Sequence, residues 1–96
     1  MVALLLGASV AASAQAPHSR RGEVNHRLSN QNRRIDHKEA SGQMSLAEAA
    51  RLHHNDRHIR REERNMAHHD HGHITKAEQN KLNRQENRNS NQITHH

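Results

Sequence analysis

The chain repeats itself at an interval of thirty residues, which is visible when Gly42 is laid on Gly72. In both copies the glycine is followed by an aliphatic residue, a hydroxyl residue and, three positions further on, a glutamate. A hydroxyl and a glutamate at this spacing form a capping box, in which they satisfy the first backbone N–H groups of a helix. The chain is therefore expected to begin a helix twice in the same way. The matched pairs are Met44 with Ile74, Ser45 with Thr75, Ala47 with Ala77, Glu48 with Glu78 and Leu52 with Leu82.

Apolar residues recur at helical spacing on both sides of these turns. The sequence predicts an all-α fold of three helices, at about residues 23–38, 45–67 and 75–89. No glycine or proline interrupts the middle helix, which would hold the two turns about 30 Å apart. The alternative is a bend near Asn55-Asp56, which would let the turns pair side by side. The apolar stripes are Val24, Leu28 and Ile35 in the first helix, Leu52, Ile59 and Met66 in the second, and Leu82 in the third.

The apolar content available for a core is small. The chain has 96 residues, no aromatic residue and no cysteine, so disulfides and thiolate metal sites are excluded. Beyond residue 16, only eleven apolar side chains larger than alanine remain. We therefore expect marginal stability as a monomer, with homodimerisation, a bound metal or partial disorder as ways to compensate.

The two ends of the chain differ in composition from the middle. Residues 1–14 hold an uncharged apolar run followed by small residues, the pattern of a signal peptide cleaved after Ala14, and the run is too short to span a bilayer. No basic residue precedes the run, so either the start lies upstream of Met1 or the run is a buried core helix. We expect residues 15–22 to form a flexible leader, 23–89 the helical domain and 90–96 a frayed tail. The export signal predicts a periplasmic or secreted protein with no stable membrane insertion after cleavage.

Histidines are concentrated in the second turn, where residues 68–73 read HHDHGH. Imidazole nitrogens suit Cu²⁺, Ni²⁺ and Zn²⁺, and the glycine allows several side chains to converge on one ion. A second chelate is expected at His54 and His58, which lie one helical turn apart on the same face. The alternative is a solvated histidine-rich surface without a specific role. The candidate ligands in the turn are His68, His69, Asp70, His71 and His73.

Two twelve-residue segments, 37–48 and 67–78, place glycine at position 6, an aliphatic residue at position 8 and glutamate at position 12. The chain therefore resembles a degenerate pair of EF-hands, a likeness that implies two helix–loop–helix units. Loop positions 1, 3 and 5, normally Asp or Asn, are His37, Glu39 and Ser41 in the first segment and Ala67, His69 and His71 in the second. Because imidazoles replace carboxylates, calcium is not expected as the ligand. We expect Glu48 and Glu78 to be helix caps rather than metal ligands.

A weaker likeness connects the helix starts to small periplasmic stress chaperones, whose helices open with Leu-Thr-x-x-Gln. Here the corresponding segments are Met44-Ser45-Leu46-Ala47-Glu48 and Ile74-Thr75-Lys76-Ala77-Glu78. This likeness implies a different function, a metal-independent helical interaction or chaperone-like protein with a periplasmic protein partner. Its histidines would then be incidental or would respond to pH.

Enzyme activity is not expected, because the chain lacks a nucleophile with an evident base, a glycine-rich phosphate loop and an acid pair in a pocket. Nucleic-acid binding is not expected either, although the formal net charge is +5. The basic strip from Arg57 to Arg64 is interleaved with Glu62 and Glu63, and no aromatic side chain is present to stack on bases. The sequence favours an exported protein that binds a divalent transition metal for buffering, delivery or sensing.

Overall fold

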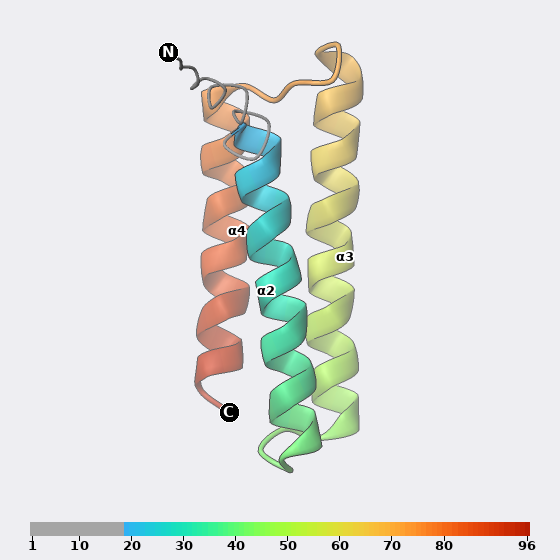
Figure 1. The fold of residues 1–96 in the computed structure, drawn as a ribbon, viewed down its shortest axis with the longest axis vertical. Helices are drawn as coiled ribbons and strands as arrows, with labels where there is room; N and C mark the ends of the chain where they lie inside the picture. The colour runs from blue at the N-terminus through green and yellow to red at the C-terminus, as the bar shows by residue number, and fades with distance from the viewer. Residues whose placement is uncertain (1–18) are drawn as a thin grey trace, which may run out of the picture.

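The computed structural model describes residues 19–96, which form a bundle of three helices (Figure 1). Helix α2 spans Arg20–Ala40, α3 spans Leu46–His69 and α4 spans Lys76–Thr94. Helices α2 and α4 run in the same direction, and α3 runs in the opposite direction (Figure 1). Each helix packs against both others. The predicted all-α fold is confirmed, and the described residues contain no strand. The predicted signal peptide lies outside the described residues.

Each helix begins where a hydroxyl side chain caps it. Ser19 Oγ accepts a hydrogen bond from Gly22 N, Ser45 Oγ from Glu48 N, and Thr75 Oγ1 from Glu78 N. The cap at Ser19 starts α2 three residues earlier than the sequence predicted, so Arg20–Gly22 belong to the helix and not to a leader. The reason is that Ser19 accepts from a backbone N–H that would otherwise lack a partner at the helix start.

The repeat turns lie at opposite ends of α3, which is unbroken over its 24 residues (Figure 1). Gly42 and Gly72 have φ values of 80° and 91°, in the left-handed region that glycine adopts without steric cost. Met44 packs in one apolar cluster and Ile74 in the other. The two turns therefore do not pair, and the helix does not bend back at Asn55-Asp56.

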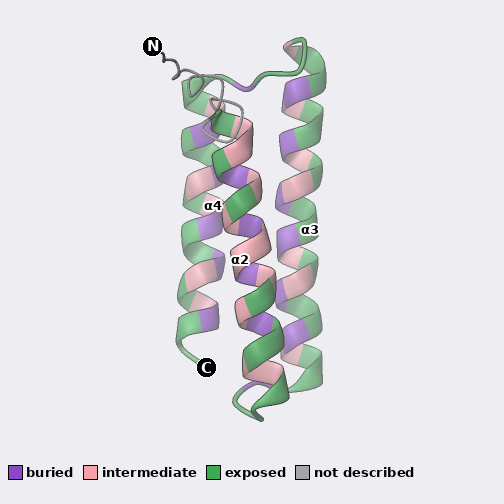
Figure 2. Cartoon of the chain, viewed as in Figure 1, coloured by how far each residue is buried: buried purple, intermediate pink, exposed green. Residues whose placement is uncertain are grey.

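The core consists of two apolar clusters, one at each end of the bundle, and the buried residues form one stripe along each helix (Figure 2). A layer of buried polar side chains lies between the clusters, and we call it the central polar layer. The first cluster contains Val24, Leu28, Ile59, Ala67, Ile74 and Leu82, the second contains Ile35, Met44, Ala49, Leu52 and Ile93, and the central polar layer contains Gln31, Asp56, Glu86 and Asn89.

The prediction that residues 90–96 form a frayed tail is wrong for most of that segment. Helix α4 continues to Thr94, and Ile93 is fully buried in the second cluster. Arg34 on α2 also donates hydrogen bonds to Ser90 Oγ at 2.8 Å and to Thr94 Oγ1 at 2.7 Å. These contacts hold the end of α4 on α2. The sequence around Ile93 is otherwise polar, so it carries no apolar pattern that predicts a packed helix end.

Over residues 19–96, no helix combines the length and the apolar content that a membrane span requires.

Candidate metal-binding turn

The histidine-rich turn joins α3 to α4 at the end of the bundle formed by the first apolar cluster (Figure 1). His68 and His69 are the last residues of α3, and Asp70 is its C-cap. Gly72 N donates to the carbonyl of Ala67 at 2.8 Å, which closes the helix end. His71 has a φ of 54°, a conformation that is uncommon for a residue other than glycine.

The four imidazoles of the turn are exposed, and Asp70 is half-buried. The rings of His68 and His69 meet edge to face with centroids 6.0 Å apart, and Nδ1 of His69 lies 2.8 Å from the carbonyl oxygen of Asn65. In the part of the chain from residue 19 onward, no three His, Asp or Glu side chains are already arranged around a common point. The turn therefore gathers the donors in one loop without orienting them toward one ion.

The second candidate pair lies elsewhere. His54 and His58 are exposed on α3, and Nε2 of His58 is 3.9 Å from Oε2 of Glu62. Ten residues of helix separate His58 from His68, which corresponds to about 15 Å. The structure therefore does not bring the pair together with the turn.

Two other histidines connect helices, a role that the sequence reading missed. Nδ1 of His53 lies 2.8 Å from Asn32 Oδ1 and its Nε2 lies 2.9 Å from Asp36 Oδ1, so the ring bridges α3 to α2. At the C-terminus, Nε2 of His96 lies 3.0 Å from Glu48 Oε2. The end of the chain that carries His95 and His96 is at the opposite end of the bundle from the histidine-rich turn (Figure 1).

The two repeat glutamates have different roles. Glu78 completes a capping box, because its Oε1 accepts from Thr75 N at 2.9 Å while its own N–H donates to Thr75 Oγ1. Glu48 instead forms an ion pair with Arg51 and contacts His96. The hydrogen bonds from Arg51 and then from His96 lower the pKa of Glu48. The prediction of a helix cap is confirmed for Glu78 and wrong for the Glu48 side chain, because neighbouring cations compete for that carboxylate.

The central polar layer was not expected from the sequence. Asn89 Nδ2 donates to Asp56 Oδ1 at 2.7 Å, and Gln31 Nε2 donates to the backbone carbonyl of Glu86 at 2.8 Å. Within the described residues, Asp56 Oδ2 and both carboxylate oxygens of Glu86 accept no hydrogen bond. Arg27 lies 3.5 Å from Glu86 Oε1. Burial raises the pKa of Asp56 to about 6 and that of Glu86 to about 7.

The signal for this layer was present in the apolar stripes. Asp56 falls between Leu52 and Ile59 on the buried face of α3, and Glu86 and Asn89 continue the stripe of Leu82 on α4. A pattern of apolar residues alone does not identify these polar positions as buried.

No family model, no curated protein and no solved structure matches the chain. The resemblance to paired EF-hands therefore stays a prediction from the spacing. In the structure the first three positions of each twelve-residue segment are helical, in α2 for the first and in α3 for the second.

Proposed function

We propose that the chain is an exported protein that binds a divalent transition-metal ion, Cu²⁺, Ni²⁺ or Zn²⁺, through the turn at residues 68–73. The observation that carries the proposal is the gathering of four exposed imidazoles within six residues of one turn. Neutral imidazole is a preferred ligand of these three ions, and a nearby carboxylate such as Asp70 completes a common ligand set.

The exposure of the turn favours this function because little has to be broken for the ligands to reorient. His69 would exchange its contact with the Asn65 carbonyl for the metal. Each side chain that is ordered costs about 0.5–1.5 kcal/mol, so the affinity should be lower than that of a rigid structural zinc site. The turn would therefore suit reversible loading, as buffering, delivery or sensing requires. His69, His71 and His73 are the principal proposed ligands, with His68 and Asp70 beside them.

His54 and His58 form a secondary proposed site. Two histidines one helical turn apart chelate an ion with only two protein ligands, which predicts weaker binding than at the turn.

The test is isothermal titration calorimetry of the chain with Cu²⁺, Ni²⁺, Zn²⁺ and Ca²⁺. We expect binding of at least one transition metal and no heat from Ca²⁺. The triple variant His69→Ala, His71→Ala, His73→Ala should weaken the affinity by about 10- to 100-fold or more. A matched control removes three exposed histidines elsewhere, His26, His37 and His95, and should leave the affinity almost unchanged. Equal loss in both variants would overturn the assignment to the turn.

The alternative, a metal-independent interaction or chaperone-like protein, has less support. A client-binding surface requires an exposed apolar patch. Among residues 19–96, Leu46 is the one large apolar side chain that is mainly exposed, at 73%. Suppression of client aggregation by the metal-free chain would favour this alternative.

A further inference from the structure

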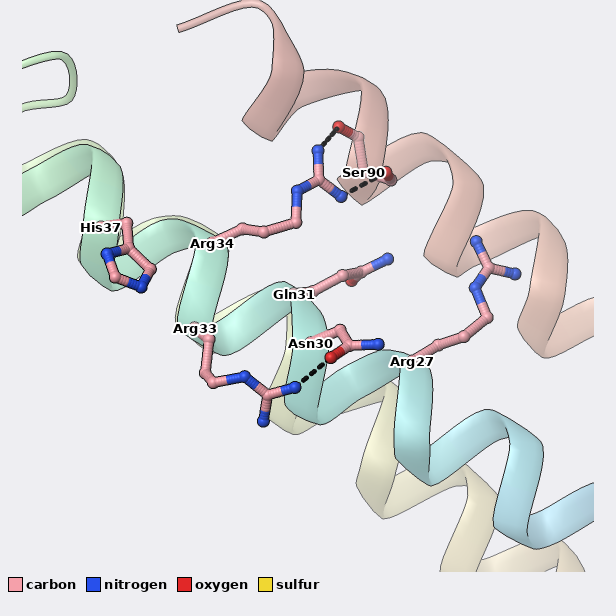
Figure 3. Close-up of a pocket in the computed structure, with 7 residues that line it drawn as sticks. All are labelled: Arg27, Asn30, Gln31, Arg33, Arg34, His37 and Ser90. Atoms are coloured by element: carbon pink, nitrogen blue, oxygen red, sulfur yellow. Dashed lines mark hydrogen bonds between the residues drawn. The ribbon is translucent and has the colours of Figure 1, made fainter. Parts of the chain in front are cut away.

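An open groove lies between α2 and α4 on the bundle surface, with a volume of about 430 Å³ (Figure 3). Its basic side chains all come from α2, and Ser90 of α4 forms part of the opposite wall. Figure 3 shows Arg34 and Arg27 extending from α2 toward α4, and Arg33 lying beside Asn30. The basic residues that line the groove are Arg27, Arg33, Arg34 and His37.

The positive charge of the groove is poorly compensated. No acidic residue is among the described residues that line it. Arg33 donates to the side-chain oxygen of Asn30, and Arg34 donates to neutral oxygens of α4. Over residues 19–96, neither of these two guanidinium groups lies within ion-pair distance of a carboxylate. Among the described arginines that line the groove, Arg27 alone approaches an acid, at 3.5 Å from Glu86 Oε1.

The arginines are also held in place before any ligand binds. Arg34 is fixed by its bonds to Ser90 Oγ and to Thr94 Oγ1. Arg27 donates to Asn87 Oδ1 at 2.7 Å. Fixing a long side chain in advance reduces the entropy that is lost on binding, and a guanidinium fork matches the oxygens of phosphate.

The length of the groove indicates the type of anion. Arg27 and His37 are ten residues apart on one helix, which corresponds to about 15 Å along its axis. A single phosphate contacts one or two side chains over such a length, whereas linked phosphates can contact all of them. We propose that the groove between α2 and α4 binds a ligand that carries several linked or adjacent phosphate groups. This site shares no residue with the histidine-rich turn and does not require metal.

The first experiment is calorimetric titration of the metal-free chain with orthophosphate, pyrophosphate and tripolyphosphate at about 0.15 M salt, where weak surface attraction is screened. Tripolyphosphate should bind more tightly than orthophosphate. The double variant Arg33→Ala, Arg34→Ala should lower the affinity for tripolyphosphate by about tenfold or more. The control Arg57→Ala, Arg61→Ala removes two exposed arginines of α3 and the same charge, and should change the affinity by at most about twofold.

Arg33→Ala separates binding from folding, and Arg34→Lys tests the need for a guanidinium group. Arg33→Ala alone leaves every bond between α2 and α4 intact, and should still weaken tripolyphosphate binding. Arg34→Lys keeps the charge but removes the fork, and should bind more weakly than the unmodified chain. Equal losses for the groove variant and the α3 control, or equal affinities for orthophosphate and tripolyphosphate, would overturn the proposal.

The source of the phosphate groups is distinguished with vesicles of phosphatidylcholine, with and without phosphatidic acid. Sedimentation of the chain with the phosphatidic acid vesicles, lost in Arg33→Ala, Arg34→Ala, would assign the groups to a lipid surface. Tripolyphosphate binding without sedimentation would assign them to a soluble ligand. Binding to neither probe would overturn the proposal.

Discussion

The side-chain amide of Asn89 on α4 donates a 2.7 Å hydrogen bond to Oδ1 of Asp56 on α3, between the two apolar clusters of the bundle. This bond satisfies one oxygen of a carboxyl group that is 1% exposed. The other oxygen, Oδ2, accepts no hydrogen bond from the described residues. A buried carboxyl in this situation favours the protonated form, and the pKa of Asp56 is accordingly raised to about 6.

The central polar layer predicts that the bundle loses stability as the pH rises. The pKa of Asp56 is raised from 3.8 to about 6 and that of Glu86 from 4.5 to about 7, mainly by burial. A raised pKa in the folded state contributes stability that is fully present below the unfolded-state pKa. That stability is lost as the pH rises from about 4 to about 7. The loss should be on the order of 3 kcal/mol per carboxyl group in the free energy of unfolding.

The prediction is tested by comparing the unmodified chain with a variant that lacks both carboxyl groups. Asp56→Asn combined with Glu86→Gln keeps the side-chain shapes and removes both titrations. The unmodified chain should lose stability relative to this variant between about pH 4 and pH 7, measured by urea unfolding followed by circular dichroism. Parallel pH profiles for the two proteins would refute this role of the layer.

Removing the amide of Asn89 should destabilise the fold. Asn89→Ala leaves Asp56 Oδ1 without its donor and also removes the bond to the Leu52 carbonyl. An unsatisfied buried group costs about 1–3 kcal/mol. Asn80→Ala, at an exposed position of the same helix, is the control and should change the free energy of unfolding by at most about 0.5 kcal/mol. Similar values for both variants would contradict the structure.

Truncating Ile93 should have a large effect, although it lies three residues from His96, the last residue of the sequence. Ile93 is fully buried against the second cluster, so Ile93→Ala should cost about 2–5 kcal/mol. The exposed neighbour Asn91 provides the control, as Asn91→Ala. A cost below about 1 kcal/mol for Ile93→Ala would instead indicate that the end of α4 is frayed.

The two repeat turns should differ in a double-mutant cycle, even though their sequences match. Thr75 and Glu78 each accept a hydrogen bond from the backbone N–H of the other, and each bond holds the turn in the conformation that the other needs, so Thr75→Ala and Glu78→Ala should couple, by about 0.5–1 kcal/mol. For Ser45 and Glu48 only the backbone N–H of Glu48 is bonded to Ser45, and Glu48→Ala leaves that bond in place. The second cycle should therefore show no coupling, and equal couplings would contradict the different roles of the two glutamates.

The number of helices and the starts of α3 and α4 were predictable because they depend on local chemistry. The hydroxyl caps at Ser45 and Thr75 and the left-handed turns at Gly42 and Gly72 are encoded within a few residues each. The cap at Ser19 has the same chemistry, but no capping box marks it in the sequence.

The rest depends on contacts between helices, which spacing alone does not reveal. Asp56 and Asn89 are separated by 33 residues, and each by itself is a polar residue typical of a solvated face. Their burial follows from the register of α3 against α4. The positions of the candidate ligands in the turn were predictable from the run of histidines, whereas the orientation of each ring depends on the packing around it.

Copper provides the most direct test of the central claim, because Cu²⁺ is paramagnetic and broadens the NMR signals of nuclei close to it. The backbone amide signals of the chain are recorded while Cu²⁺ is added below one equivalent. Metal binding at the turn predicts that the signals of residues 68–73 broaden first. Those of His95 and His96, at the other end of α4 and roughly 30 Å away, should remain sharp. Broadening that begins at His95 and His96, or that affects all exposed histidines equally, would contradict metal binding at the turn.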